Sequence, residues 1–203
     1  MDMRRRTSLA LTAGLAAMVV ADALTHQGIR MTAYALTAIA IVNLFDPLFR
    51  YVFRTQLSYP VLLADLVFAV VGTYVGNRMD LYERLFAYDI ALHFISGILI
   101  VLTFYEVFFP PHRAPAIPFA MRLALAAIIG LAGAALWEIM EFSLDVIVQS
   151  DVQRNLRPGQ ELIGRNWQNP GLVDTMNDMI DGLAGSLVGC AMIFFRQRKA
   201  NGK

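Results

Sequence analysis

The sequence is poor in cysteine, in charge and in nucleotide-binding motifs. Cys190 is the single cysteine among 203 residues, so a disulfide within the chain is excluded. Because Cys190 lies inside an apolar run, we expect a small core residue with no redox or metal role. Only 16% of the residues are charged, and neither a P-loop nor a dinucleotide fingerprint occurs. We therefore expect no nucleotide cofactor and no nucleic-acid partner.

What the chain has in abundance is apolar sequence. Hydrophobic residues make up 57% of it, and the mean hydropathy is +0.53. The apolar runs are long enough to cross a bilayer as helices and too long for barrel strands. The composition predicts an all-α, polytopic membrane helix bundle that forms a single transmembrane domain over residues 1–203. The six expected spans are residues 8–24, 31–49, 59–76, 86–109, 119–148 and 172–195.

The first run has a second interpretation. Residues 1–23 combine a basic head, an apolar stretch and the cleavage-like Ala21-Asp22-Ala23, which is typical of a secretory signal. We favour a retained helix because five further spans follow and need no separate signal.

Lysine and arginine predict the orientation. With both termini in the cytoplasm, the cytoplasmic segments hold eleven of these residues and the outer segments hold six. An excess of positive charge inside is the usual arrangement in membrane proteins.

Three carboxylates open the last span, where acids are costly. Asp174, Asp178 and Asp181 follow the spacing of one helical face, and glycines continue that face toward the C-terminus. Small residues allow another backbone to approach, so we expect the acidic face to be packed against other helices. Ionisable residues inside a membrane span usually mark function.

Two other spans carry matching polar stripes. We counted the helix rise from the predicted outer membrane boundary. The ionisable side chains of the three spans then lie at common depths, the shallowest about 3–5 Å and the deepest about 13–15 Å below that boundary. We therefore expect a site in the outer-leaflet half. The predicted ligands or acid–base groups are Asp89, His93, Glu138, Glu141, Asp174 and Asp178. Asp181 is expected to be a further metal ligand, and Asp145 is expected to support the ligands without binding the ion itself.

These acids need compensation, because no lysine or arginine lies on the matching stretches. Carboxylates cannot all stay charged together in a low-dielectric site. Shared protons, water or bound cations would neutralise them. Carboxylates with one imidazole suit a divalent metal ion such as Zn, Mg, Mn or Fe.

Other intramembrane acids receive different predictions. Asp22 and His26 could extend the site, Asp46 is expected at a helix end or turn, and Asp65 is expected to be structural.

The longest loop, residues 149–171, joins the two most acidic spans. We expect it to fold back over the acids, with Trp167 at the membrane interface. Its arginines could pair with the acids or with a phosphate, and an ordinary solvated loop is an equal alternative. These arginines are Arg154, Arg157 and Arg165.

The polar motifs resemble those of the YjdF-like family of uncharacterised bacterial inner-membrane proteins. VanZ-like membrane proteins show a looser version. The resemblance implies a bacterial inner-membrane location and supplies no reaction. The motifs that carry it are Tyr88-Asp89-x3-His93-Phe94-x2-Gly97, Trp137-Glu138-x2-Glu141-Phe142 and Asp174-Thr175-x2-Asp178-Met179-x5-Gly185.

Three functions fit these patterns. The first is a metal-binding protein, or a metal-dependent enzyme, acting on a lipid or lipid-linked substrate at the outer leaflet. The second is a proton- or cation-coupled transporter that uses the same acids as a relay. The third is a non-catalytic envelope or assembly factor. The expected partners are membrane lipids and a lipid-linked substrate.

The orientation is testable by cysteine labelling. Gln160→Cys, in a Cys190→Ser background, should react with an impermeant maleimide added from the outside, because the long loop is expected there. Reaction only after the cytoplasmic face is opened would reverse the predicted topology.

Overall fold

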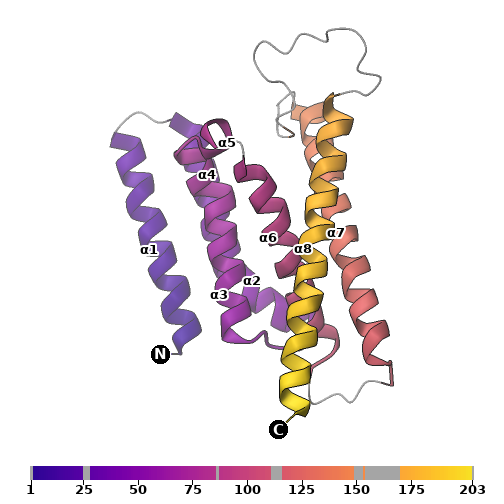
Figure 1. The fold of residues 1–203 in the computed structure, drawn as a ribbon. Helices are drawn as coiled ribbons and strands as arrows, with labels where there is room; N and C mark the ends of the chain where they lie inside the picture. The colour runs from indigo at the N-terminus through magenta and orange to yellow at the C-terminus, as the bar shows by residue number, and fades with distance from the viewer. Residues whose placement is uncertain are drawn as a thin grey trace. The chain divides into compact units, whose positions relative to one another are not determined.

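The chain folds into helices throughout its described part. The computed structural model describes residues 2–24, 28–85, 87–110, 116–148, 153 and 170–202, and that part contains no strand. The elements, drawn in Figure 1, are α1 (Met3–Leu24), α2 (Gly28–Phe53), α3 (Tyr59–Val70), the π-helical η1 (Val71–Val75), α4 (Gly76–Arg78), α5 (Leu81–Arg84), α6 (Ala87–Phe108), α7 (Phe119–Val148) and α8 (Pro170–Asn201).

The all-α, multi-pass membrane class is confirmed. Five helical stretches of the described residues are long and apolar enough to cross a membrane. Helix α1 covers the first expected span but is not among them, so a sixth crossing stays a prediction. The five stretches are Met31–Phe53, Tyr59–Arg78, Ala87–Phe108, Phe119–Ile147 and Gly171–Ala200.

The contacts divide the chain into two compact units. Unit 1 is Met1–Tyr88 with Glu106–Ala114, and unit 2 is Asp89–Tyr105 with Pro115–Lys203. Each unit is described by itself. The single-domain organisation expected from the sequence stays a prediction.

Unit 1 buries apolar side chains between α1, α2, α3 and η1. One cluster contains Val42, Leu62 and Leu66, and a second contains Leu15 and Tyr74. At the start of α3, the Glu106 carboxylate accepts hydrogen bonds from Ser58 N and Ser58 Oγ, both at 2.7 Å. Helix starts leave backbone N–H groups unpaired, so this half-buried acid satisfies a helix end.

Asp46 corrects an expectation. It lies inside α2, which continues through Pro47 to Phe53, and not at a helix end or turn. Its carboxylate is 3.1 Å from Arg4 Nη1 and 2.9 Å from Arg50 Nη2. Two cations from α1 and α2 therefore compensate this acid, which explains why it is tolerated within a helix.

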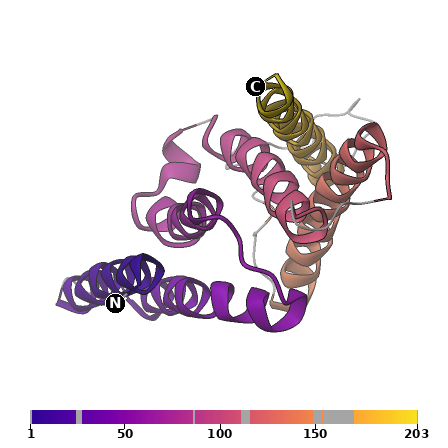
Figure 2. The ribbon, with the colours of Figure 1, turned by 90° about the horizontal axis from the view of Figure 1, so that it is seen from below.

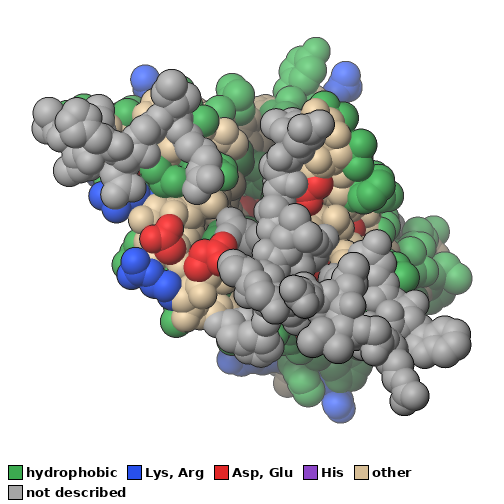
Figure 3. All heavy atoms as spheres, turned by 90° about the horizontal axis from the view of Figure 1, so that it is seen from above, with side chains coloured by type: hydrophobic (Ala, Val, Ile, Leu, Met, Phe, Trp, Pro, Cys, Tyr) green, Lys and Arg blue, Asp and Glu red, His purple; other side chains and the backbone are tan. Residues whose placement is uncertain are grey.

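Asp22 is also compensated inside unit 1. It is 1% exposed, accepts a 2.6 Å hydrogen bond from the Tyr74 hydroxyl and pairs with Arg78. Asp22 therefore has partners outside the predicted site, and His26 lies outside the described residues. In contrast to the buried Asp22, other acids of the chain lie on the surface. Acidic and basic side chains adjoin on the face seen in Figure 3, and the exposed Asp80–Arg84 pair is 3.4 Å apart.

Unit 2 is built from the middle of α6 together with α7 and α8, which are seen from below in Figure 2. A Cβ atom at Gly97 would overlap the carbonyl oxygen of Gly182, and one at Gly185 would overlap that of Phe94. The backbones of α6 and α8 thus touch where the glycines lie. This confirms the expected packing of the small-residue face.

Replacing one of these glycines should weaken unit 2. Gly97→Ala places a methyl group against backbone atoms of α8, so α6 and α8 must move apart. We expect a loss of about 1–3 kcal/mol, the usual cost of overpacking a core. Thermal unfolding in detergent measures it. Gly14→Ala is the matched control, since nothing lies within 4 Å of a Cβ there; equal melting temperatures for both variants would contradict the close packing.

Candidate metal centre

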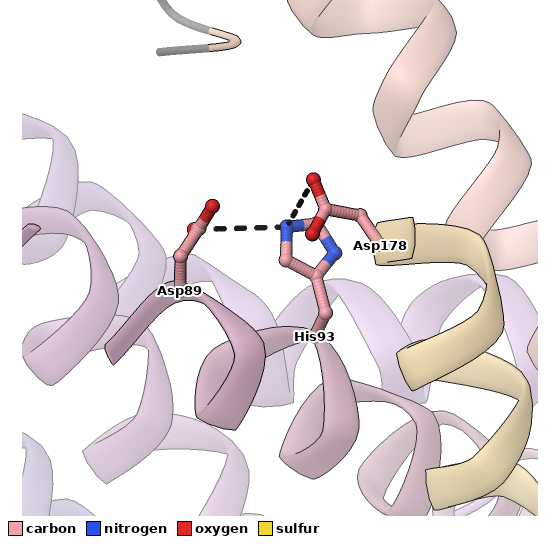
Figure 4. Close-up of side chains that lie close together, drawn as sticks. All are labelled: Asp89, His93 and Asp178. Carbon is pink, nitrogen blue, oxygen red and sulfur yellow. Dashed lines mark ion pairs between the residues drawn. The ribbon is translucent and has the colours of Figure 1, made fainter. Parts of the chain in front are cut away.

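Two carboxylates converge on one imidazole nitrogen. Asp89 and His93 lie one turn apart on α6, and Asp178 projects from α8 (Figure 4). His93 Nε2 is 3.7 Å from Asp89 Oδ1 and 3.7 Å from Asp178 Oδ2. One potential ligand atom from each residue lies within 4.8 Å of the others. The structure thus brings together three of the predicted site residues.

Burial differs among these three side chains. His93 and Asp178 are 8% and 7% exposed, whereas Asp89 is 33% exposed. The group is therefore closed on the side of α8 and accessible beside Asp89.

Glu138 of α7 lies at the other nitrogen of the same ring. Its Oε1 is 3.9 Å from His93 Nδ1, and its side chain is 3% exposed. Both carboxylate oxygens are buried and make no hydrogen bond of standard geometry within the described part of the chain. The Thr175 side chain interacts with Glu138 without reaching that geometry. Buried polar atoms are normally paired, so this carboxylate requires an explanation.

The remaining predicted acids surround this group. Glu141 is buried and accepts a 2.7 Å hydrogen bond from Trp137 Nε1. Asp174 lies within electrostatic range of Glu138 and Glu141, and Asp181 lies within range of His93. The seven predicted positions therefore share one neighbourhood. Their roles as ligands or acid–base groups stay predictions.

Gln153 is a polar contact that the sequence did not reveal. Its backbone N–H donates to Asp145 Oδ2 at 3.1 Å, and its amide Nε2 donates to Thr175 Oγ1 at 3.0 Å. It thereby joins α7 and α8 beside the acids. No sequence pattern distinguishes it from other loop polar residues. Arg154, Arg157, Arg165 and Trp167, on which the lid prediction rests, lie outside the described residues.

An apolar core follows the polar group along the three helices. Val101, Ala126, Cys190 and Ile193 form a buried cluster. Between the two regions, the Ser186 hydroxyl donates to Gly182 O at 2.8 Å, so that it too is satisfied. The described acids of unit 2 are thus concentrated at one end of its helices.

The group of Asp89, His93 and Asp178 could hold a divalent ion. Among the described residues, the ion-pair partner of Asp89, Glu138 and Asp178 is His93, and no lysine or arginine pairs with them. One imidazole with carboxylates suits zinc, iron or manganese. Ligand atoms 3.7 Å apart subtend about 120° at an ion with bonds of about 2.1 Å. An ion therefore fits between His93 and each aspartate.

Comparison with known proteins gives a family without an assigned activity. Residues 7–199 match the family described as "Predicted membrane protein (DUF2238)". An "Uncharacterized protein" of Thermotoga maritima is 29% identical over 151 residues, which are 74% of this chain and 65% of the relative. No solved structure matches. The YjdF-like resemblance is confirmed, because that family is the one matched; the VanZ-like resemblance stays a prediction.

The Glu138 carboxylate, which makes no hydrogen bond of standard geometry among the described residues, should cost stability in protein stripped of metal. Glu138→Leu removes two buried oxygens that lack hydrogen bonds, so we expect a gain of about 1–3 kcal/mol in chelator-treated protein, measured by thermal unfolding. Glu106→Leu is the contrast, because Glu106 accepts two hydrogen bonds from Ser58, and it should lower stability. Destabilisation of similar size in both variants would show that Glu138 is well satisfied.

Proposed function

The chain belongs to the family of predicted membrane proteins (DUF2238), and we propose that it binds one divalent metal ion through Asp89, His93 and Asp178. The protein is a multi-pass membrane protein. The bacterial cytoplasmic membrane is its proposed location, with both termini in the cytoplasm. The bacterial relative is in accord with this location.

One observation carries the metal proposal. His93 Nε2 faces a carboxylate oxygen of Asp89 and one of Asp178 at equal distances of 3.7 Å, and two of these three side chains are buried. Leaving charges buried and uncompensated is strongly unfavourable. A dication at this point would neutralise both aspartates at once.

The proposed chemistry extends to catalysis on a lipid or lipid-linked substrate. Three protein ligands leave a coordination position open, as in catalytic zinc sites. The 33% exposure of Asp89 supports access of a substrate to the site from the side of that residue. A metal there would polarise a phosphoryl or carbonyl oxygen, or activate a water. Glu141, Asp174 and Asp181 are then candidates for acid–base work around it.

A relay for transport is less well supported. Proton or cation transport requires polar groups that continue to the other membrane face. In unit 2 the polar group is followed by the buried cluster of Val101, Ala126, Cys190 and Ile193. An apolar layer of this kind favours a bound ion over a conducted one.

The direct test is metal content. Protein purified without chelator should contain about one divalent ion per chain, measured by mass spectrometry at neutral pH, because protons compete for the ligands at lower pH. Asp178→Asn should remove most of it. Asp65→Asn is the matched control, since Asp65 is a half-buried intramembrane acid of unit 1. Equal losses in the two variants, or wild-type protein that neither holds nor takes up metal, would leave the proton relay as the better explanation.

A further inference from the structure

The imidazole of His93 has carboxylates on both sides. Nε2 faces Asp89 and Asp178 at 3.7 Å, and Nδ1 faces Glu138 at 3.9 Å. If Glu138 were simply another ligand of the same ion, its carboxylate would be expected at the Nε2 side. It lies at the opposite nitrogen.

A neutral imidazole that binds metal through Nε2 carries its proton on Nδ1. In a buried site this N–H needs an acceptor, and metal-bound histidines usually donate it to a carboxylate, a carbonyl or water. The Glu138 carboxylate is on the correct side, is 3% exposed and has no hydrogen bond of standard geometry within the described residues. A movement of about 1 Å would bring the pair to hydrogen-bond distance.

The packing of α7 explains why Glu138 reaches this nitrogen. Gly130, Ala134 and Glu138 lie four residues apart on one face of α7. A Cβ atom at Gly130 would meet Ser186 and Val101, and the Ala134 methyl lies 3.0 Å from the Cβ position of Gly182. This face is therefore pressed against α6 and α8, and Glu138 is the next residue on it.

Glu141, one turn further on α7, is different. It accepts the indole N–H of Trp137 at 2.7 Å and so already has a donor. Of the two buried glutamates on α7, Glu138 is the one with neither oxygen in a hydrogen bond of standard geometry among the described residues.

We infer that Glu138 is a positioning residue: it accepts the Nδ1–H hydrogen bond of His93 and thereby presents Nε2 to an ion held by Asp89 and Asp178. This inference rests on the proposed metal site. It separates the carboxylates into two that bind the ion and one that holds the histidine.

The test measures zinc affinity by competition with a chromophoric chelator and measures zinc per chain at saturation. Glu138→Leu should weaken zinc binding about 10–100-fold, the usual cost of losing an outer hydrogen-bond partner, with one ion per chain retained. Glu138→Gln keeps an acceptor oxygen and should restore most of the affinity. Glu141→Gln is the matched control on the same helix and should have a smaller effect than Glu138→Leu.

A double-mutant cycle shows whether Glu138 acts through the histidine. In a His93→Ala background, Glu138→Leu should change the remaining zinc affinity by less than ~2-fold, because the group it orients is gone. A merely structural role would give the same loss in both backgrounds. Size-exclusion profiles and unfolding in chelator verify that each variant is folded.

Three results would overturn the inference while leaving the metal site intact. They are an unchanged affinity in Glu138→Leu, an equal loss in both His93 backgrounds, and a loss in Glu138→Gln as large as that in Asp178→Asn, which would make Glu138 a ligand. Wild-type protein that binds no zinc or other divalent ion would instead remove the proposed site, and the inference with it.

Discussion

Unit 2 depends on one constraint: carboxylates enter its packed interior, and among the described residues no lysine or arginine pairs with Asp89, Glu138 or Asp178. Asp178 must reach His93 across the α6–α8 contact, and that contact is close because Gly97 meets Gly182 backbone to backbone. The glycines and the acids are therefore parts of one arrangement. Larger residues at the contact would separate the helices and pull Asp178 away from the imidazole.

Unit 1 shows what a compensated acid looks like in the same chain. Asp46 has Arg4 and Arg50, Asp22 has Arg78 and the Tyr74 hydroxyl, and Glu106 accepts hydrogen bonds at the start of α3. Each of these acids therefore has a cation or a hydrogen-bond donor as its partner within unit 1. Asp89, Glu138 and Asp178 have no such cation among the described residues, and this contrast distinguishes a candidate ligand set from structural charge.

The helices and the acidic set were predictable because both depend on local spacing. Apolar runs define spans, and carboxylates three or four residues apart share a helical face. Which acid faces which nitrogen was not predictable, since it depends on how α7 is rotated against its neighbours. That rotation follows from contacts such as Ala134 against Gly182. The Arg4–Asp46 ion pair and the Gln153–Thr175 hydrogen bond likewise join residues distant in sequence.

The spacing within the cluster also bears on what neutralises it. A proton shared between two groups requires a hydrogen bond of about 2.5–3.2 Å. The nitrogen–oxygen separations around His93 are 3.7–3.9 Å, too long for direct sharing. Two ligands of one ion, each about 2.1 Å from it, are naturally held further apart than the two ends of a hydrogen bond. The Nε2 side holds two carboxylates, as expected for two ligands of one ion, whereas the Nδ1 side holds one, as expected for the acceptor of the ring N–H.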